Sequence, residues 1–338
     1  MALRVGINGL GRIGRLTLRN WATRHRDAFT IVAANDLADA TTAAHLTAFD
    51  SAYGAFPGRI ESGPGTIAID GHELRVTSER DPAAIPWGDA GVEVVIDATG
   101  KFRDRAAAGS HLRDGVRKVL ISANGRNEDL TIIYGVNHDA YDPASHHIIS
   151  AGSCTTNCVT PLAKVLLDRF GIRGALLTTV HAITNGQSLL DSAQKDLRRA
   201  RTASESIIPT TTGASDAVAK ALPALAGKID GMALRVPTAS VSIVDLVTQL
   251  ERPASVEEIN DAVAEAAATE LHGILHYETR ELVSVDFKQH DASSIFDAPL
   301  TRVLDSGLTK TLAWYDNEWG YVSRLTDICA LFAERGIS

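Results

Sequence analysis

Short apolar runs alternate with amphipathic stretches over the first 150 or so residues of the chain. The runs are rich in Val, Ile, Leu and Ala, which is typical of buried parallel strands. They cover residues 3–8, 29–34, 92–98, 118–122 and 148–151. Amphipathic stretches at 15–24 and 40–47 predict helices, and Asp39 is placed to cap the second of them. This alternation predicts an α/β fold with a parallel sheet and helical crossovers.

The pattern changes at residue 154. Residues 154–170 predict one helix, although Pro161 is unfavourable inside it. Longer strands follow, together with two more helices at 256–270 and 327–335. The strands are predicted at 175–180, 232–236, 241–250 and 311–315. We therefore expect a second, α+β domain with a large mixed sheet. Residues 183–206 form a long polar loop, and loops of this length are usually functional or interfacial.

Composition narrows the classes of function. A chain of 338 residues favours two domains. The net charge of −8 argues against a nucleic-acid or membrane-surface role, since both favour basic surfaces. We see no apolar run of roughly 18 residues, as a membrane span needs, and no signal-peptide pattern. Three cysteines are too few for a disulfide framework, which favours the cytoplasm, and Cys154 and Cys158 lack the spacing of a zinc pair, so no metal is predicted.

Gly9, Gly11 and Gly14 form a G-x-G-x-x-G motif between the first predicted strand and the first helix. In this context, glycines permit a tight turn and close approach of the backbone to a pyrophosphate at the helix N-terminus. Asp36 ends the second strand, where a carboxylate can accept a hydrogen bond from a ribose 2′-hydroxyl. The same charge would repel a 2′-phosphate. The motif therefore predicts dinucleotide binding with a preference for NAD over NADP.

Cys154 lies between a predicted strand and a predicted helix, among Ser and Thr residues. The helix N-terminus and polar neighbours favour a thiolate, so we predict a nucleophile. We interpret Cys158 and Cys329 as buried core residues. Of the 11 histidines, His181 is the preferred proton acceptor because it follows an apolar strand. His25, His111, His146 and His147 are interpreted as ordinary surface or turn residues.

At these motifs the chain resembles the phosphorylating glyceraldehyde-3-phosphate dehydrogenase family over essentially its whole length. The matching segments are residues 5–14, 97–102, 153–158, 178–181, 208–213, 234–238 and 314–321. Residues 196–201 and 282–287 are more similar to the bacterial and plastid branch. The resemblance implies an N-terminal Rossmann dinucleotide-binding domain at 1–153, on which a C-terminal helix at about 318–338 packs. It implies a catalytic and oligomerisation domain at 154–317, and a homotetramer in which the 183–206 loop reaches a neighbouring subunit's cofactor.

The resemblance also implies a reaction. Cys154 would attack the aldehyde of D-glyceraldehyde-3-phosphate to give a thiohemiacetal. His181 would remove its proton as hydride leaves for NAD, and inorganic phosphate would release 1,3-bisphosphoglycerate from the resulting thioester. Positions that match the substrate phosphate site are Thr184, Arg201 and Arg235. Those that match the inorganic phosphate site are Ser153, Thr155, Thr212 and Gly213. Arg198 is a rival for the role of Arg201.

Further positions match cofactor contacts of the family. They are Gly9, Gly11, Arg12, Ile13, Gly14, Asp36, Arg80, Thr99, Gly100, Ser122, Asn317 and Tyr321, with Asn317 implied to hold the carboxamide. Small residues at Ser192 and Ala193 stand where NAD-specific relatives carry bulkier ones. We therefore predict NAD as the main cofactor, with secondary use of NADP.

Several alternatives remain open. Erythrose-4-phosphate dehydrogenase shares the scaffold, although Thr184 and residues 210–213 favour the triose enzyme. Relatives usually carry alanine where Gly152 stands, and residues 123–126 also depart from the pattern. These changes suggest a paralogue with altered sensitivity to thiol-directed inhibitors. A non-catalytic dinucleotide sensor and a cysteine hydrolase are disfavoured, because the nucleophile, the base and the cofactor motif are all present.

Overall fold

The computed structural model describes residues 2–338, and the chain forms two compact units. The first unit consists of the chain up to Ile132, His138–Gly152 and Val322–Ser338. The second unit consists of Ile133–Asn137 and Ser153–Tyr321. Each unit has its own sheet, and each is described separately below.

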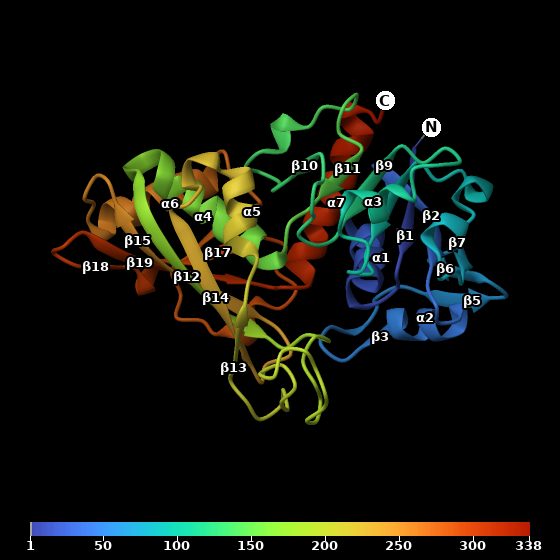
Figure 1. Cartoon of the computed structure of the whole chain (residues 1–338), viewed down its shortest axis with the longest axis horizontal. Coiled ribbons are helices and arrows are strands. Elements are labelled where there is room, and N and C mark those ends of the chain that lie inside the picture. Colours follow the sequence, from blue (N-terminus) through green and yellow to red (C-terminus); the bar gives the residue numbers. More distant parts are fainter. Residues whose placement is uncertain (1) are drawn as a thin grey trace. The chain divides into compact units, whose positions relative to one another are not determined.

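The first unit contains a nine-stranded sheet (Figure 1). Its parallel strands are β1 (Leu3–Asn8), β2 (Phe29–Asn35), β7 (His72–Thr77), β8 (Val94–Asp97), β9 (Lys118–Ile121), β10 (Leu130–Thr131) and β11 (Ile148–Ser150). β5 (Ile60–Gly63) and β6 (Thr66–Ile69) extend one edge by antiparallel pairing. The order is β10-β11-β9-β8-β1-β2-β7-β6-β5. The predicted parallel sheet is confirmed. The strands at its β5 edge escaped prediction because they are only four residues long and partly exposed.

The helices of this unit are α1 (Arg12–Arg24), α2 (Ala40–Ala48) and α3 (Arg105–Gly109), and β3 (Phe49–Asp50) pairs with β4 (Gly54–Ala55). Asp39 caps α2 as predicted, accepting a hydrogen bond from the Thr42 N–H at 2.7 Å. α1 begins at Arg12 rather than at residue 15. A Cβ on Gly14 would lie 2.0 Å from the Gly9 carbonyl oxygen, so this glycine permits close approach of α1 to the preceding turn.

α7 (Trp319–Arg335) is the last helix of the chain. It begins eight residues before the 327 predicted from the apolar pattern, and close to the 318 that the family resemblance implies. Within the first unit, Thr326 Oγ1 donates to Asn20 Oδ1 at 2.7 Å, and His25 Nε2 lies 2.8 Å from Asp327 Oδ1. α7 therefore docks on α1 through a buried polar interface, and His25 is a partner in it rather than a simple surface residue.

The second unit contains an eight-stranded mixed sheet in the order β13-β14-β12-β15-β19-β17-β16, with β18 paired to β19. The strands are β12 (Ile172–Ala182), β13 (Ile208–Thr211), β14 (Ile229–Val236), β15 (Ser242–Leu250), β16 (Leu275–Glu278), β17 (Ser294–Asp297), β18 (Arg302–Val303) and β19 (Leu308–Tyr315). This confirms the predicted α+β architecture with a large mixed sheet. The predicted strands all lie inside longer observed ones, except that β15 begins at Ser242 rather than at 241.

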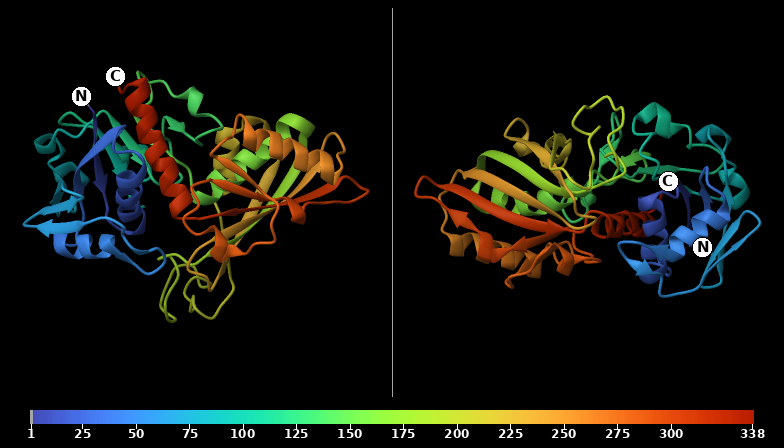
Figure 2. Two further views of the ribbon diagram at one scale, coloured as in Figure 1. Left: turned by 180° about the vertical axis from the view of Figure 1, so that it is seen from behind. Right: turned by 90° about the horizontal axis from the view of Figure 1, so that it is seen from below.

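One face of this sheet is covered by helices α4 (Cys154–Phe170), α5 (Ala214–Ala221) and α6 (Val256–Ala268) (Figure 1). α4 has the predicted bounds, and its Pro161 lies inside the helix among buried residues. On the other face, Phe287 stacks on Trp314 of β19, whereas Leu176 and Met232 remain 65% and 41% exposed. The loop at residues 183–206 connects β12 to β13 without a helix or strand of its own (Figure 2).

Candidate active site

The N-terminus of α4 presents Cys154. Ser153 is the N-cap, and its side chain accepts a hydrogen bond from the Thr156 N–H at 3.1 Å. Cys154 is therefore the first helical residue, close to the unpaired N–H groups and positive end of the helix dipole. Its side chain is half-buried, whereas Cys158 and Cys329 are fully buried as predicted.

A row of residues across the sheet faces this helix end. Arg235 on β14 pairs in register with His181 on β12, and Ser242 on β15 pairs with Tyr315 on β19. The pairing of Val180 with Ile243 continues the register, so that His181 lies beside Ser242. The edge of the His181 ring meets the Tyr315 ring at a centroid distance of 5.9 Å. Rigid neighbouring strands thus position these side chains together.

The structure brings Cys154 and His181 together. Cys154 Sγ lies 3.4 Å from His181 Nε2, within the distance of a hydrogen bond to sulfur. His181 Nδ1 lies 2.7 Å from the Ala182 carbonyl oxygen, an acceptor that favours a proton on Nδ1. With the proton on Nδ1, the Nε2 lone pair faces the thiol. Arg235 Nη1, 2.5 Å from Nδ1, is a donor that favours the other tautomer, so the carbonyl and the guanidinium compete for this nitrogen. The predicted pairing therefore has the geometry of a nucleophile and its base.

Burial and a neighbouring cation determine the protonation of this pair. Burial, and then the Arg235 guanidinium, lower the pKa of His181 to about 3. Burial raises the pKa of Cys154, although Arg235 and hydrogen bonds from Thr155 act in the opposite direction. Burial thus opposes the thiolate that the sequence predicts, and the reactive thiolate stays a prediction. The low pKa of His181 favours a neutral imidazole.

Arg235 is the cation of the site. One of its nitrogens, Nη1, lies 2.5 Å from His181 Nδ1 and donates to the Ala182 carbonyl oxygen at 3.2 Å. Its Nε is buried without a hydrogen-bond partner, and burial lowers the pKa of the guanidinium. A buried N–H donor without an acceptor is costly. The position therefore suits an anionic ligand, as the sequence suggested.

The structure does not bring Arg201 or Arg198 to this row. The exposed Arg201 Nε pairs with Asp191 Oδ2 at 2.8 Å within the loop, and Arg198 is also exposed. Arg199 instead donates from Nε to Thr210 Oγ1 on β13 at 2.7 Å, and its charge acts on Arg235. Arg199, rather than the predicted Arg201, is thus the arginine of this loop that contacts the sheet, and the phosphate role of Arg201 stays a prediction. The sequence could not separate three arginines within four residues, because loop geometry decides which one faces the sheet.

The other predicted phosphate residues have local partners. Thr155 Oγ1 bonds to the Tyr315 hydroxyl at 2.9 Å, and Thr184 Oγ1 donates to Gln187 Oε1 at 3.2 Å. Thr212 Oγ1 accepts from the Ala214 N–H at 3.2 Å, and Gly213 is the N-cap of α5. Sequence reasoning missed Tyr315, whose hydroxyl also bonds to Thr179 Oγ1 at 2.8 Å. Its only signal was its place in a matched segment.

Asn317 and Tyr321 also lie in the second unit. Asn317 Oδ1 accepts a hydrogen bond from Ser242 Oγ at 3.0 Å, and Ser242 Oγ accepts from the Ala182 N–H at 3.0 Å. Asn317 is thereby linked to the backbone next to His181. Tyr321 is buried, and burial raises the pKa of its hydroxyl.

A crevice of about 290 Å³ lies at the carboxyl ends of the strands in the first unit. The residues that line it are Asn8, Gly9, Gly11, Asn35, Asp36, Leu37, Glu79, Arg80, Ala98, Thr99, Lys101 and Phe102. Such a crevice is the expected place for a dinucleotide in an open α/β sheet. A Cβ on Gly11 would meet nothing within 4 Å, so the backbone there is open to close approach by a ligand. The crevice therefore fits a dinucleotide.

Asp36 holds the glycine-rich turn in addition to lining the crevice. Its Oδ2 accepts from the Leu10 N–H at 2.6 Å, and its Oδ1 accepts from the Ala38 N–H at 2.8 Å. Among the other predicted contacts, Arg12 bonds to Asp50 Oδ2 at 2.5 Å. Arg12 does not line the crevice, and neither do four other predicted cofactor contacts of the first unit. They are Ile13, Gly14, Gly100 and Ser122.

Two further sequence interpretations have structural outcomes. His111 is fully buried and bonded on both sides, so its interpretation as a surface or turn residue is wrong. Gly152 has a φ of +66°, a region that favours glycine, so the departure from alanine here is free of backbone strain. No structural feature explains altered inhibitor sensitivity, which stays a prediction.

The dinucleotide crevice and the thiol–imidazole pair define a class: dehydrogenases that form a covalent bond to substrate through cysteine. Residues 3–105 match the family model "Glyceraldehyde 3-phosphate dehydrogenase, NAD binding domain", and residues 153–317 match the corresponding C-terminal domain. The chain belongs to the glyceraldehyde 3-phosphate dehydrogenase family. The predicted family and NAD as its cofactor are confirmed.

Curated relatives align over nearly the entire chain. The glyceraldehyde-3-phosphate dehydrogenase of Geobacillus stearothermophilus is 50% identical over 337 residues, covering 100% of both chains. Glyceraldehyde-3-phosphate dehydrogenase 1 of Streptomyces avermitilis is 51% identical over 334 residues, 99% of each chain. Glyceraldehyde-3-phosphate dehydrogenase 1 of Bacillus subtilis is 48% identical over 337 residues, 100% of each chain. Across residues 2–338, no helix has both the length and the apolar character to cross a bilayer.

Proposed function

We propose that this protein oxidises D-glyceraldehyde-3-phosphate and phosphorylates it to 1,3-bisphosphoglycerate, reducing NAD. The observation that carries the proposal is the 3.4 Å separation of Cys154 Sγ and His181 Nε2 beside the Arg235 guanidinium. Family membership and the names of the full-length relatives support the same activity. The first unit would serve as the dinucleotide-binding domain and the second as the catalytic and oligomerisation domain.

The thiol attacks the aldehyde carbon, and its proton passes to His181 Nε2 and from there to the carbonyl oxygen, which becomes the hydroxyl of the thiohemiacetal. As the thiohemiacetal is oxidised, the free Nε2 takes up the hydroxyl proton and a thioester remains on Cys154. NAD, when bound, supplies a hydride acceptor for this step. Phosphate oxygen then attacks the thioester carbon, and the Cys154 sulfur leaves and is reprotonated.

Substrate binding would also adjust the base. Arg235 opposes protonation of His181. A phosphate dianion near Arg235 and Arg199 would offset that charge and raise the pKa of His181 toward a useful range. We therefore assign the substrate phosphate to Arg235 and Arg199, with Thr184 in support. Ser153, Thr155, Thr212 and Gly213 would serve inorganic phosphate, since Ser153 and Thr155 flank Cys154 in the chain.

NAD would be preferred over NADP. Asp36 lines the crevice with a carboxylate held by two backbone N–H groups, so a 2′-phosphate there would meet a fixed negative charge. Secondary use of NADP is proposed from the small residues at Ser192 and Ala193. Specificity constants for the two cofactors test this, and a larger value for NADP would contradict it.

Exposed apolar side chains on the second sheet support a homotetramer. Leu176 is 65% exposed in a strand, and a large apolar side chain on an open sheet favours association. Sedimentation or light scattering should give four times the chain mass, and Leu176→Lys should dissociate the assembly. A monomer at micromolar concentration would contradict this. The three free cysteines support a reducing compartment, for which we propose the cytoplasm.

The decisive assay follows NADH formation from glyceraldehyde-3-phosphate with and without inorganic phosphate. The expected result is multiple turnovers only with phosphate, and at most one per site without it. Turnover independent of phosphate would instead indicate a hydrolysing aldehyde dehydrogenase. A parallel assay with erythrose-4-phosphate distinguishes the neighbouring activity, and Cys154→Ser is the inactive control.

A further inference from the structure

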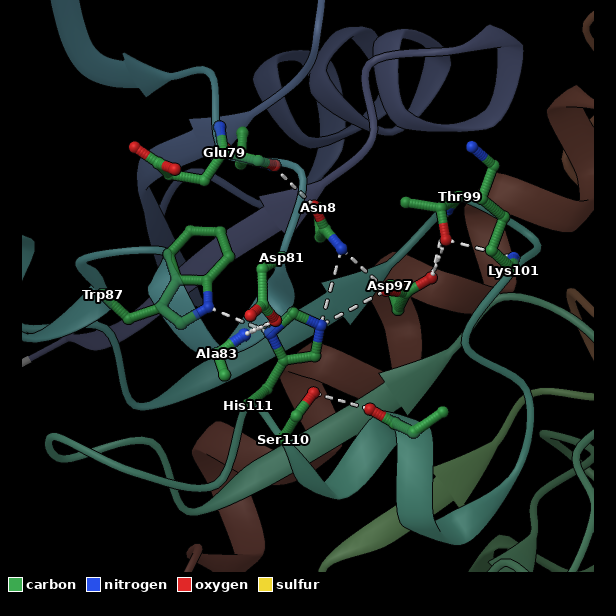
Figure 3. Close-up of polar contacts among 12 residues, drawn as sticks. Asn8, Glu79, Asp81, Ala83, Trp87, Asp97, Thr99, Lys101, Ser110 and His111 are labelled. Atoms are coloured by element: carbon green, nitrogen blue, oxygen red, sulfur yellow. Dashed lines mark hydrogen bonds and ion pairs between the residues drawn. The ribbon is translucent and has the colours of Figure 1, made fainter.

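A buried polar network lies next to the dinucleotide crevice in the first unit (Figure 3). At its centre are Asn8, Asp97 and His111, which are 3%, 1% and 0% exposed. Asn8 ends β1 and Asp97 ends β8, the neighbouring parallel strand, whereas His111 follows α3. His111 does not line the crevice and has no part in the reaction proposed above.

The hydrogen bonds of His111 define its tautomer. Trp87 Nε1 lies 3.1 Å from His111 Nδ1, and an indole nitrogen can only donate. Nδ1 is therefore the acceptor, and Nε2 carries the proton. That proton faces Asp97 Oδ2 at 3.3 Å. The 3.5 Å approach of Asn8 Nδ2 to His111 Nε2 joins two donors and is not a hydrogen bond, so both groups converge on the same carboxylate oxygen.

Asp97 receives donors on both of its oxygens. Oδ2 accepts from His111 Nε2 and from Asn8 Nδ2, the latter at 2.9 Å. Oδ1 accepts from the Thr99 N–H at 3.1 Å and from Thr99 Oγ1 at 2.6 Å. The carboxylate is fully enclosed by donors, and its orientation is set by them. If the His111 donor were lost, Oδ2 would be left with one partner in a buried environment.

Two arms lead from this carboxylate to the crevice. Thr99 lines the crevice itself, and its hydroxyl accepts from the N–H of Lys101, which also lines it. On the other arm, Asn8 Oδ1 accepts from Asn35 Nδ2 at 3.0 Å. The Asn35 amide then holds the backbone of Glu79 on both sides, donating to its carbonyl at 2.9 Å and accepting from its N–H at 2.8 Å. Glu79 immediately precedes Arg80, another residue of the crevice.

We propose that His111 is a positioning residue for the dinucleotide: through Asp97 it sets Thr99 and, through Asn8 and Asn35, the Glu79–Arg80 segment. The physical basis is preorganisation, since groups already held in their bound positions lose less entropy on binding. The inference rests on the proposed NAD-dependent function. Because the thiol–imidazole pair belongs to the other unit, His111 acts on cofactor affinity and not on the chemical step.

Two substitutions of His111 test its hydrogen bonds to Trp87 and Asp97 separately. In His111→Asn the short amide can still accept from Trp87 but cannot reach Asp97. In His111→Gln the longer side chain can still donate to Asp97 but leaves the Trp87 N–H without its acceptor. Both remove the ring, so both should lower the melting temperature to a similar extent.

The measurement is the Kd for NAD by titration calorimetry on the full-length protein, with KM and kcat from steady-state kinetics. We expect His111→Asn to raise the Kd about tenfold, with kcat at saturating NAD within about twofold of the parent. His111→Gln should stay within about threefold of the parental Kd. Equal Kd values for the two variants would overturn the positioning role, since a purely structural histidine would not distinguish them. A parent chain that fails to bind NAD would overturn the proposed function itself.

Thr77→Val tests the second arm without disturbing the buried ring. Thr77 Oγ1 donates to Asn35 Oδ1 at 3.0 Å, and Thr77 does not line the crevice. The substitution keeps the shape of the side chain and removes one donor, so the Kd for NAD should rise about threefold. An unchanged Kd would overturn the role of Asn35 in holding the Glu79–Arg80 segment. This outcome can be read even if the His111 variants fail to fold.

Discussion

His111 and His181 are both buried, yet their surroundings differ in kind. His111 accepts from an indole N–H on one side and donates to a carboxylate on the other, so both ring nitrogens are satisfied. His181 has the cation of Arg235 close to Nδ1, and its Nε2 faces a thiol that chemistry must deprotonate. The comparison shows that burial alone does not identify a catalytic histidine. A catalytic histidine is identified by polar neighbours whose interactions are completed only when a ligand binds.

Among the tests of the contrast between His181 and His111, Cys154→Ser should have the largest effect. Because the thiol is the nucleophile facing His181, we expect kcat to fall by at least about 10⁴-fold, to be measured as NADH formation. Cys158→Ser is the matched control, since this thiol lies one helical turn away in the core and bonds weakly to Ser294. The control should retain most of the parental kcat. Substantial activity in Cys154→Ser would refute the covalent route.

His181→Gln sets the two histidines directly against each other. Loss of the base should lower kcat by about 10²–10⁴-fold. His111→Gln should instead leave kcat nearly unchanged at saturating NAD, because the His111 side chain belongs to the polar network of the first unit. Similar losses of kcat in the two variants would contradict the assignment of a catalytic role to His181 alone.

Two arginine substitutions test which arginine of the 183–206 loop binds the substrate phosphate. Arg199→Ala removes a guanidinium held at Thr210, and we expect KM for glyceraldehyde-3-phosphate to rise at least about tenfold. Arg201→Ala removes an exposed ion pair with Asp191, and such pairs contribute about 0–1 kcal/mol. Its KM should therefore stay within a few-fold of the parent. A larger increase in KM for Arg201→Ala than for Arg199→Ala would show that Arg201 binds the substrate.

The smallest expected effect is on stability against pH. The pKa of His181 is about 3 in the folded chain and ordinary when unfolded, so the unfolded state binds more protons between these values. Stability should fall as pH drops from about 6.5, by at most about 1.4 kcal/mol per pH unit from this group. Urea unfolding of His181→Gln should show a shallower fall than the parent. Identical slopes would mean that His181 is not held neutral.

Sequence patterns predicted five of the seven parallel strands of the first unit, the full extent of α4 and the two-domain architecture. β7 and β10 were missed because neither is a continuous apolar run. The Cys154–His181 pairing also followed from element ends, because a helix start and a strand end are places where rigid structure presents side chains. The network around His111 could not be predicted, since its members lie on separate elements and meet only in the folded sheet. Arg199 was missed for a related reason, because no periodicity governs the 183–206 loop.

The electrostatics of Cys154 resisted prediction because two effects of opposite sign meet there. The helix N-terminus was visible in the sequence, whereas the depth of burial was not. The hydrogen bond between Thr326 of α7 and Asn20 of α1 was likewise beyond prediction, since it joins opposite ends of the chain.

The depth of the site has a consequence for the lifetime of the protein. Thiolates, rather than thiols, react with peroxides and alkylating agents. Burial raises the pKa of Cys154 and so slows these reactions, whereas the Arg235 charge acts in the opposite direction and favours the nucleophile. Burial and Arg235 thus serve two demands on one sulfur atom: durability between turnovers and attack on substrate.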